Sequence, residues 1–338
     1  MNRGRDRNYP TDAFGLPEGL LAAIVGALLL VGAFVLTSAA TAMPATERWA
    51  ALTTISLLAV AVTLPGCAAI YDALGRAVRQ DWRAAVTLLA LVPALYNAYA
   101  LAVNEFRLND ALAALFFAGV PAMAFWRAGR SRQPTIFDAL ALSYLAVSLW
   151  IGLLPNLTLP EQGGLVGFLP LASVPLLLLL FAWRGWPGVG YSWHLRGPDL
   201  RDALLAALAA LAVLVLVTLL TNNRSVGLTP TAGSLISSAI TTYFFVAIPT
   251  ELLLRGGIQN GLARALTPGM GQMGNVFALI TTATLWAGLG MLSGGWLGLL
   301  KGAMIGLAGG WVYLRSGKTT AAAVTHGLIV WVLSQLGF

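Results

Sequence analysis

The C-terminal part of the chain carries few side chains capable of acid–base chemistry, and one pair of them has helical spacing. After Asp202 the only carboxylate is Glu251, and Arg255 follows it four residues later. Residues four apart share a helix face, so the spacing predicts an ion pair. An ionised carboxylate alone in lipid is costly, and Glu251 therefore needs such a partner. The pair is either a functional site or a structural ion pair near the cytoplasmic interface.

The second candidate is His326, near the middle of the last apolar stretch, residues 319–336. This histidine is either satisfied by a hydrogen bond to a neighbouring helix or acts as a proton carrier or metal ligand. Catalytic zinc usually keeps three protein ligands, and one histidine with one carboxylate is too few. The sequence therefore predicts no metal and no cofactor.

Membrane-spanning helices must position these side chains. Of the 338 residues, 58% are hydrophobic and only 10% are charged, and the mean hydropathy is +0.79. A soluble core could not hide so much apolar surface. Stretches of roughly 20 apolar residues, enough to span a bilayer, repeat along the chain. We expect an all-α, polytopic transmembrane bundle of about eleven spans. The predicted spans are residues 17–42, 50–72, 83–103, 109–126, 135–155, 164–183, 199–220, 233–254, 273–292, 296–314 and 319–337.

The basic residues predict the orientation. The net charge of +7 comes mostly from arginine, and the arginine clusters fall in alternate loops, as the positive-inside rule requires. We expect a multi-pass protein of a cytoplasmic-type membrane, with a cytoplasmic N-terminus and an external C-terminus. The expected partners are membrane lipids and another integral membrane protein or a larger membrane complex. Nucleic acid is not an expected partner.

A Gly/Pro-rich aromatic connector, residues 186–198, divides the chain. We predict an N-terminal unit of about six spans over residues 1–185 and a C-terminal unit of about five spans over residues 186–338. One predicted span of the second unit carries a glycine at every fourth position: Gly298, Gly302, Gly306 and Gly310. Such a face lets another helix backbone approach closely, so it predicts tight helix packing.

Three segments of the C-terminal unit resemble the CPBP family of intramembrane proteases. This family is also called the CAAX-protease and bacteriocin-processing or Abi family, and it includes proteins like the type II CAAX prenyl endopeptidase. The family motifs are Glu-Glu-x-x-x-Arg, Phe-x-x-x-His and His-x-x-x-Asn or Asp. They align here with residues 250–255 (Thr-Glu-Leu-Leu-Leu-Arg), 286–290 (Trp-Ala-Gly-Leu-Gly) and 326–330 (His-Gly-Leu-Ile-Val). The resemblance covers about residues 187–338 and implies the family fold there.

The catalytic set that the resemblance implies is incomplete. Its retained members are Glu251, Arg255 and His326. In the family, the leading Glu of the first motif and the His of the second hold and activate the hydrolytic water. The matched positions are Thr250 and Gly290, which supply no base. The third motif supports the oxyanion, and Val330 cannot donate the hydrogen bond that the family Asn or Asp position provides. The resemblance therefore predicts a catalytically degenerate member.

Several functions stay open at this point. We expect a pseudoprotease that acts as a binding or scaffold subunit within the membrane. The alternative is an active intramembrane endopeptidase with altered catalytic residues, using Glu251 and His326. A transporter or lipid-handling protein is a third possibility, but ion paths need more polar groups than the last five spans offer. If the helices match the family, replacing Thr250→Glu together with Gly290→His should leave the protein folded.

Overall fold

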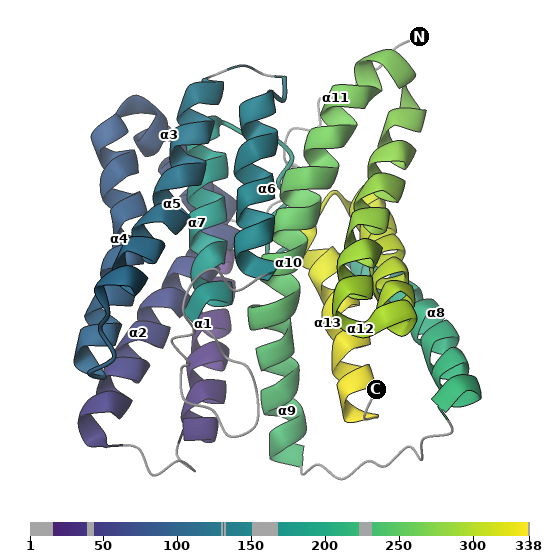
Figure 1. Cartoon of the computed structure of the whole chain (residues 1–338), viewed down its shortest axis with the longest axis horizontal. Helices are drawn as coiled ribbons and strands as arrows, with labels where there is room; N and C mark the ends of the chain where they lie inside the picture. Colours follow the sequence, from purple (N-terminus) through teal and green to yellow (C-terminus); the bar gives the residue numbers. More distant parts are fainter. Residues whose placement is uncertain are drawn as a thin grey trace.

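Helices make up the regular structure of the described part of the chain (Figure 1). The computed structural model describes residues 16–38, 44–129, 131, 133–150, 168–222 and 232–336. The helices of the first half are α1 (Leu16–Ser38), α2 (Ala45–Thr63), the 3₁₀ turn η1 (Leu64–Gly66), α3 (Ala68–Gln80), α4 (Trp82–Ala102), α5 (Leu108–Ala128), α6 (Ile136–Trp150) and α7 (Phe168–Arg184). Those of the second half are α8 (Gly197–Asn222), α9 (Ala232–Thr241), the π-helical η2 (Thr242–Ala247), α10 (Ile248–Glu251), the π-helical η3 (Leu252–Gln259), α11 (Asn260–Met270), α12 (Gln272–Ser316) and α13 (Thr319–Gln335).

The predicted multi-pass helical bundle is confirmed. Within the ranges described, seven helical stretches are long and apolar enough to cross a membrane. The other predicted spans correspond to the shorter helices α6, α7 and α13 and to the second of two arms within the 45-residue α12. Parts of the predictions lie outside the described residues, namely 1–15, 39–42, 151–155, 164–167 and 337. The orientation of the termini stays a prediction.

The span predicted at 50–72 is wrong in one respect, because the helix breaks inside it. Pro65 lies in the turn between α2 and α3, and proline cannot donate a backbone hydrogen bond. Carbonyl groups near the break are satisfied from the distant connector. The Trp193 Nε1 donates to the Thr63 carbonyl at 2.6 Å, and the Tyr191 hydroxyl donates to the preceding carbonyl at 2.8 Å. The sequence spacing alone could not show these partners.

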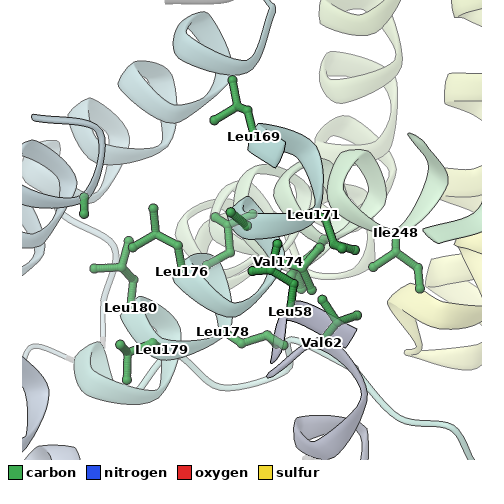
Figure 2. Packing of buried hydrophobic residues seen from close by; sticks show 14 of the residues in the cluster. Leu58, Val62, Leu169, Leu171, Val174, Leu176, Leu178, Leu179, Leu180 and Ile248 are labelled. Atoms are coloured by element: carbon green, nitrogen blue, oxygen red, sulfur yellow. The ribbon is translucent and has the colours of Figure 1, made fainter. Parts of the chain in front are cut away.

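Helix α7 is the central helix of the first half. It is apolar on every face and is surrounded by other helices. Fourteen of its 17 residues are buried. In Figure 2 its side chains lie close to Leu58 and Val62 of α2 and to Ile248 of α10. A helix that is hydrophobic all round must be covered by other elements, and α2, α3, α4, α5 and α10 all pack against α7.

One hydrophobic core includes residues of both predicted units. The largest cluster of buried side chains holds Leu176 and Leu180 of α7 together with Ile248 and Leu252 from the second half. The predicted boundary at residue 185 therefore falls within a shared core, and the division into two units stays a prediction.

The connector also fixes the start of α13. The Thr319 amide donates to the Gly190 carbonyl at 2.9 Å, and the Thr320 hydroxyl donates to the Ser192 carbonyl at 2.6 Å. Gly190 has φ of 69°, and a Cβ at this position would lie 2.0 Å from the Gly317 carbonyl oxygen. Only glycine suits both the left-handed backbone and this close approach. The connector thereby sets where the last helix enters the bundle.

Helix α12 is a hairpin of two arms, the first light green and the second yellow-green (Figure 1). The helical backbone is interrupted at Gly294 and Gly295, and Gly295 has φ of 59°. This break falls between the spans predicted at 273–292 and 296–314, so the sequence located both arms. The left-handed backbone at the tip is one that glycine adopts without strain.

The glycine ladder of the second arm is packed against the backbone of the first arm. A Cβ on Gly302 would lie 2.7 Å from the Trp286 carbonyl oxygen, and one on Gly306 would lie 2.9 Å from the Ala283 Cα. Two helix backbones can approach this closely only where no side chain intervenes. The predicted tight packing is therefore confirmed at these positions.

A pair of glycine substitutions on α12 tests this packing. Gly302→Ala should destabilise the protein by about 1–3 kcal/mol, because the added methyl group meets fixed backbone. Gly288→Ala is the control, since a Cβ at Gly288 has open space around it. That control should be neutral or stabilising by up to about 1 kcal/mol, because alanine favours helix. Both effects can be measured by reversible unfolding in mixed micelles, and equal effects would contradict the packing.

Candidate functional site

The site is built on an irregular stretch of the helix that follows α9. The π-helical η3 has wide turns, a feature that is frequent at functional sites. Its backbone is supported from the connector, because the Trp186 Nε1 donates to the Gly256 carbonyl at 3.1 Å. The Asn260 amide donates to the same carbonyl at 3.2 Å and to the Pro187 carbonyl at 2.7 Å. These bonds satisfy backbone groups that lipid could not.

Glu251 lies between the guanidinium of Arg255 and the imidazole of His326, so the three side chains predicted from the sequence meet at one point. The Arg255 Nε lies 2.6 Å from one carboxylate oxygen of Glu251, and the His326 Nδ1 lies 2.8 Å from the other. All three side chains are at most 1% exposed. The structure thus brings Glu251 and Arg255 of the first motif together with His326 of α13. The predicted ion pair exists, and both carboxylate oxygens are occupied.

The remaining donors of Arg255 are also satisfied inside the protein. Its Nη1 donates to the Gln259 Oε1 at 2.9 Å, and its Nη2 donates to the Gly306 carbonyl at 2.9 Å. The Gln259 amide donates in turn to the Gly310 carbonyl at 3.2 Å. Satisfying a buried guanidinium requires such partners, because its charge cannot reach water. The network ties η3 to the second arm of α12.

Glycines in the second arm of α12 make its contact with η3 possible. A Cβ on Gly309 would lie 3.2 Å from a carboxylate oxygen of Glu251, and one on Gly310 would lie 3.0 Å from the Arg255 Nη1. Larger residues would push the two helices apart and lengthen the hydrogen bonds to the α12 carbonyls. One face of the second arm therefore contacts the first arm, while another face accepts hydrogen bonds from Arg255 and Gln259.

Sequence reasoning missed Gln259 and Lys301. Gln259 follows Arg255 at the same four-residue spacing that revealed the ion pair, so that signal was present in the sequence. Lys301 lies in the second arm of α12 and lines a cavity beside His326. Nothing in its local sequence pointed to that cavity, because the position depends on the fold of the hairpin.

A cavity of about 560 Å³ opens beside the network, between the tip of the α12 hairpin and the helices around it. His326, Gly290 and Val330 all line it, so two of the three aligned motifs meet at this cavity. Trp286 lies on the wall, its ring centroid 5.9 Å from that of His326. Thr250 is half-buried and is not among the residues that line the cavity.

Gly290 has no room for a side chain. A Cβ built there would lie 2.2 Å from the Gly298 carbonyl oxygen across the hairpin, and a Cβ on Gly298 would lie 2.0 Å from the Gly290 carbonyl oxygen. This contact argues against our expectation that Thr250→Glu together with Gly290→His would leave the protein folded, because an added side chain at position 290 meets backbone. The physical reason is the direct backbone contact between the two arms, which no single aligned motif reveals.

The geometry limits what the site can do chemically. The Nδ1 of His326 is used by Glu251, so Nε2 is the ring nitrogen left for the cavity that His326 lines. A histidine oriented by a carboxylate is a proton acceptor in many enzymes. No three His, Cys, Asp or Glu side chains of the described ranges cluster closely enough to hold a metal ion.

The comparison with protein families agrees with the aligned motifs. Residues 232–332 match the family model described as type II CAAX prenyl endopeptidase Rce1-like. This segment is an Rce1-like domain. It runs from α9 into α13 and contains the whole network of Glu251, Arg255 and His326. The match confirms the suspected relationship to the CAAX-protease family. No curated protein and no solved structure matches the chain.

Replacing Arg255 tests how much this network contributes to the stability of the Rce1-like domain. Arg255→Met should destabilise the protein by about 3–5 kcal/mol, because it leaves a buried carboxylate without its cation. The matched control is Arg315→Met, whose partner Asp202 lies 3.3 Å away and whose side chain is 56% exposed. The control should cost about 1 kcal/mol or less. Unfolding curves for both variants check this prediction. Similar losses of unfolding free energy would mean that the buried network stabilises the protein no more than an exposed ion pair does.

Proposed function

We propose that the chain is an intramembrane binding protein, a pseudoprotease that holds an apolar or lipidated segment of another membrane protein without cutting it. The observation that carries this proposal is the contact between Gly290 and Gly298. In the family, the position matched by Gly290 supplies the histidine that helps to activate water. Here the position has no side chain, and a Cβ would lie 2.2 Å from backbone.

The other residues support the same conclusion. Glu251 is bound on both oxygens, at 2.6 Å by Arg255 and at 2.8 Å by His326. To act as a base toward water, the fully buried Glu251 would have to give up one of these contacts. Thr250 supplies no base and Val330 supplies no oxyanion donor. Losing a general base and an oxyanion donor each costs about 10²-fold or more in rate.

The cavity itself suits an apolar ligand. Trp150, Trp286, Ile305 and Val330 provide aromatic and aliphatic walls. The polar groups of the lining are those of His326, Lys301, Thr218 and Ser293. Binding sites for lipid-like or apolar segments commonly combine such walls with a few polar groups. A segment held beside His326 would face no activated water, so binding without cleavage is the expected outcome.

A prenylated peptide carrying a photoreactive group tests binding and cleavage on one purified sample. We expect crosslinking to the cavity without release of the C-terminal fragment. Leu297→Trp should reduce crosslinking at least tenfold by filling the cavity that Leu297 lines. Leu299→Trp is the control, because Leu299 is exposed on the same arm and is not among the cavity residues. Equal crosslinking in both variants would show that the ligand binds elsewhere and would contradict the proposal.

A second function, residual peptidase activity, is favoured by the hydrogen bond between Glu251 and His326. The 2.8 Å contact orients the imidazole, and Nε2 could then take a proton from water in the cavity. This function would work without the usual base of the family. It predicts slow cleavage rather than binding alone.

Cleavage of the same prenylated peptide separates the two functions. If His326 is a base, His326→Gln should lower the rate by about 10²- to 10⁴-fold, and Glu251→Gln should also lower it. Leu333→Ala, a buried site on the same helix, controls for losses caused by packing alone. Measurable turnover that both substitutions abolish in folded protein would favour the peptidase. Absence of turnover in the unaltered protein would favour binding.

A further inference from the structure

A second cavity lies in the first half of the chain, on the face shared by α4, α5 and α7. It is a groove of about 670 Å³ and is lined almost wholly by apolar side chains. Its floor is made of small residues, among them Pro93 of α4 and Ala118, Gly119 and Ala122 of α5. The small side chains leave space between α4 and α5 at this point, and the larger side chains around them form the walls of the groove. The groove is separate from the network of Glu251.

The length of the groove matches one leaflet of a bilayer. Along α4 it runs from Trp82 to Pro93, and along α5 from Trp126 to Leu115. Eleven helical residues at 1.5 Å each give about 16 Å. Half of the hydrocarbon core of a membrane is about 15 Å thick. A single acyl chain lying in the groove would therefore reach from the interface to the middle of the membrane.

One end of the groove has the chemistry of a membrane interface. Trp82 is the first residue of α4, while Trp126 and Trp183 lie in the last turns of α5 and α7, so all three tryptophans mark the same end. Trp82 and Trp126 are 64% and 70% exposed. Tryptophan is enriched where hydrocarbon meets headgroups, so this end of the groove opens at that depth.

The charges at this end favour an anion. Arg83 and Arg127 are exposed and follow directly on Trp82 and Trp126 in the sequence. The Arg83 guanidinium lies 5.8 Å from the Trp82 ring centroid. The acidic group nearest in sequence is Asp81, whose carboxylate accepts a hydrogen bond from the Arg83 amide at 2.8 Å and so caps α4.

Neighbouring charges on the other elements do not cancel this preference. Helix α3 adds exposed Arg76 and Arg79 against the single carboxylate of Asp72. Arg184, at the end of α7, is neutralised by its buried ion pair with Asp138 at 2.7 Å. The described residues at this end therefore carry more positive than negative charge.

We propose that the groove binds one anionic phospholipid, with an acyl chain along Pro93 and Gly119 and the phosphate beside Arg83 and Arg127. The exposed arginines at the tryptophan end favour a ligand with an anionic headgroup over an uncharged apolar helix of a partner protein. The proposal does not depend on the function proposed for the Rce1-like domain.

Native mass spectrometry of the full chain, after exchange into detergent with equal phosphatidylglycerol and phosphatidylcholine of matched acyl chains, tests the proposal. We expect one phosphatidylglycerol to be retained. Gly119→Leu should reduce its occupancy about tenfold, because a Cβ at Gly119 has open space around it and its side chain would fill the groove. Gly32→Leu on α1, where a Cβ also has open space, is the control and should change nothing.

The headgroup is tested with charge variants. Arg83→Gln combined with Arg127→Gln should lower the preference for phosphatidylglycerol over phosphatidylcholine roughly ten- to thirtyfold, given the usual contribution of each basic residue near anionic lipid. Arg107→Gln, at the opposite end of α5, is the control and should leave the preference intact. Free inorganic phosphate should not displace the lipid.

Three results would overturn the proposal. The first is equal retention of the two lipids by the unaltered protein. The second is retention in Gly119→Leu that matches Gly32→Leu. The third is a dimer of this chain that Gly119→Leu dissociates, since that would assign the groove to a protein contact instead.

Discussion

The charge of Arg255 is fully buried and has to be satisfied inside the protein, and this requirement fixes how the second half is packed. One guanidinium contacts Glu251 and Gln259 on its own helix and the Gly306 carbonyl on α12. Because Glu251 then reaches His326, the same charge also positions α13. Three helical elements are held at one point, and their separation is set by hydrogen-bond lengths. The glycines of α12 are the condition for that spacing.

The first half supplies the support for this arrangement. Helix α7 is buried on every face and shares one core with α10 and η3, so the helix that carries Glu251 rests on a rigid neighbour. The connector adds directional contacts, from Trp186 to η3 and from Gly190 to the start of α13. Apolar packing places the helices approximately, and the hydrogen bonds of the connector define their register. Both sides of the Glu251–His326 contact are therefore anchored to the same short segment.

Local patterns in the sequence predicted local features, and contacts between distant segments remained invisible. Apolar run lengths located the helices, and the spacing of Glu251 and Arg255 predicted their ion pair, because both depend on neighbours within one turn. The contact of His326 with Glu251 spans 75 positions, and nothing in either segment specifies it. Pro65 and Gly66 mark the break between α2 and α3 locally, but the connector residues that satisfy its carbonyl groups lie too far along the chain to be predicted. The lack of space at Gly290 was also missed, because its neighbour, Gly298, belongs to the opposite arm of the hairpin.

The hairpin of α12 also restricts substitution at the positions where its two arms touch. Each arm has a glycine where the two arms touch, so any side chain at position 290 would collide with the carbonyl group of Gly298. A histidine at this position would require the arms to separate, which would in turn stretch the bond from Arg255 to the Gly306 carbonyl. The contact between the two arms therefore ties the choice of residue at position 290 to the geometry of the buried network around Arg255.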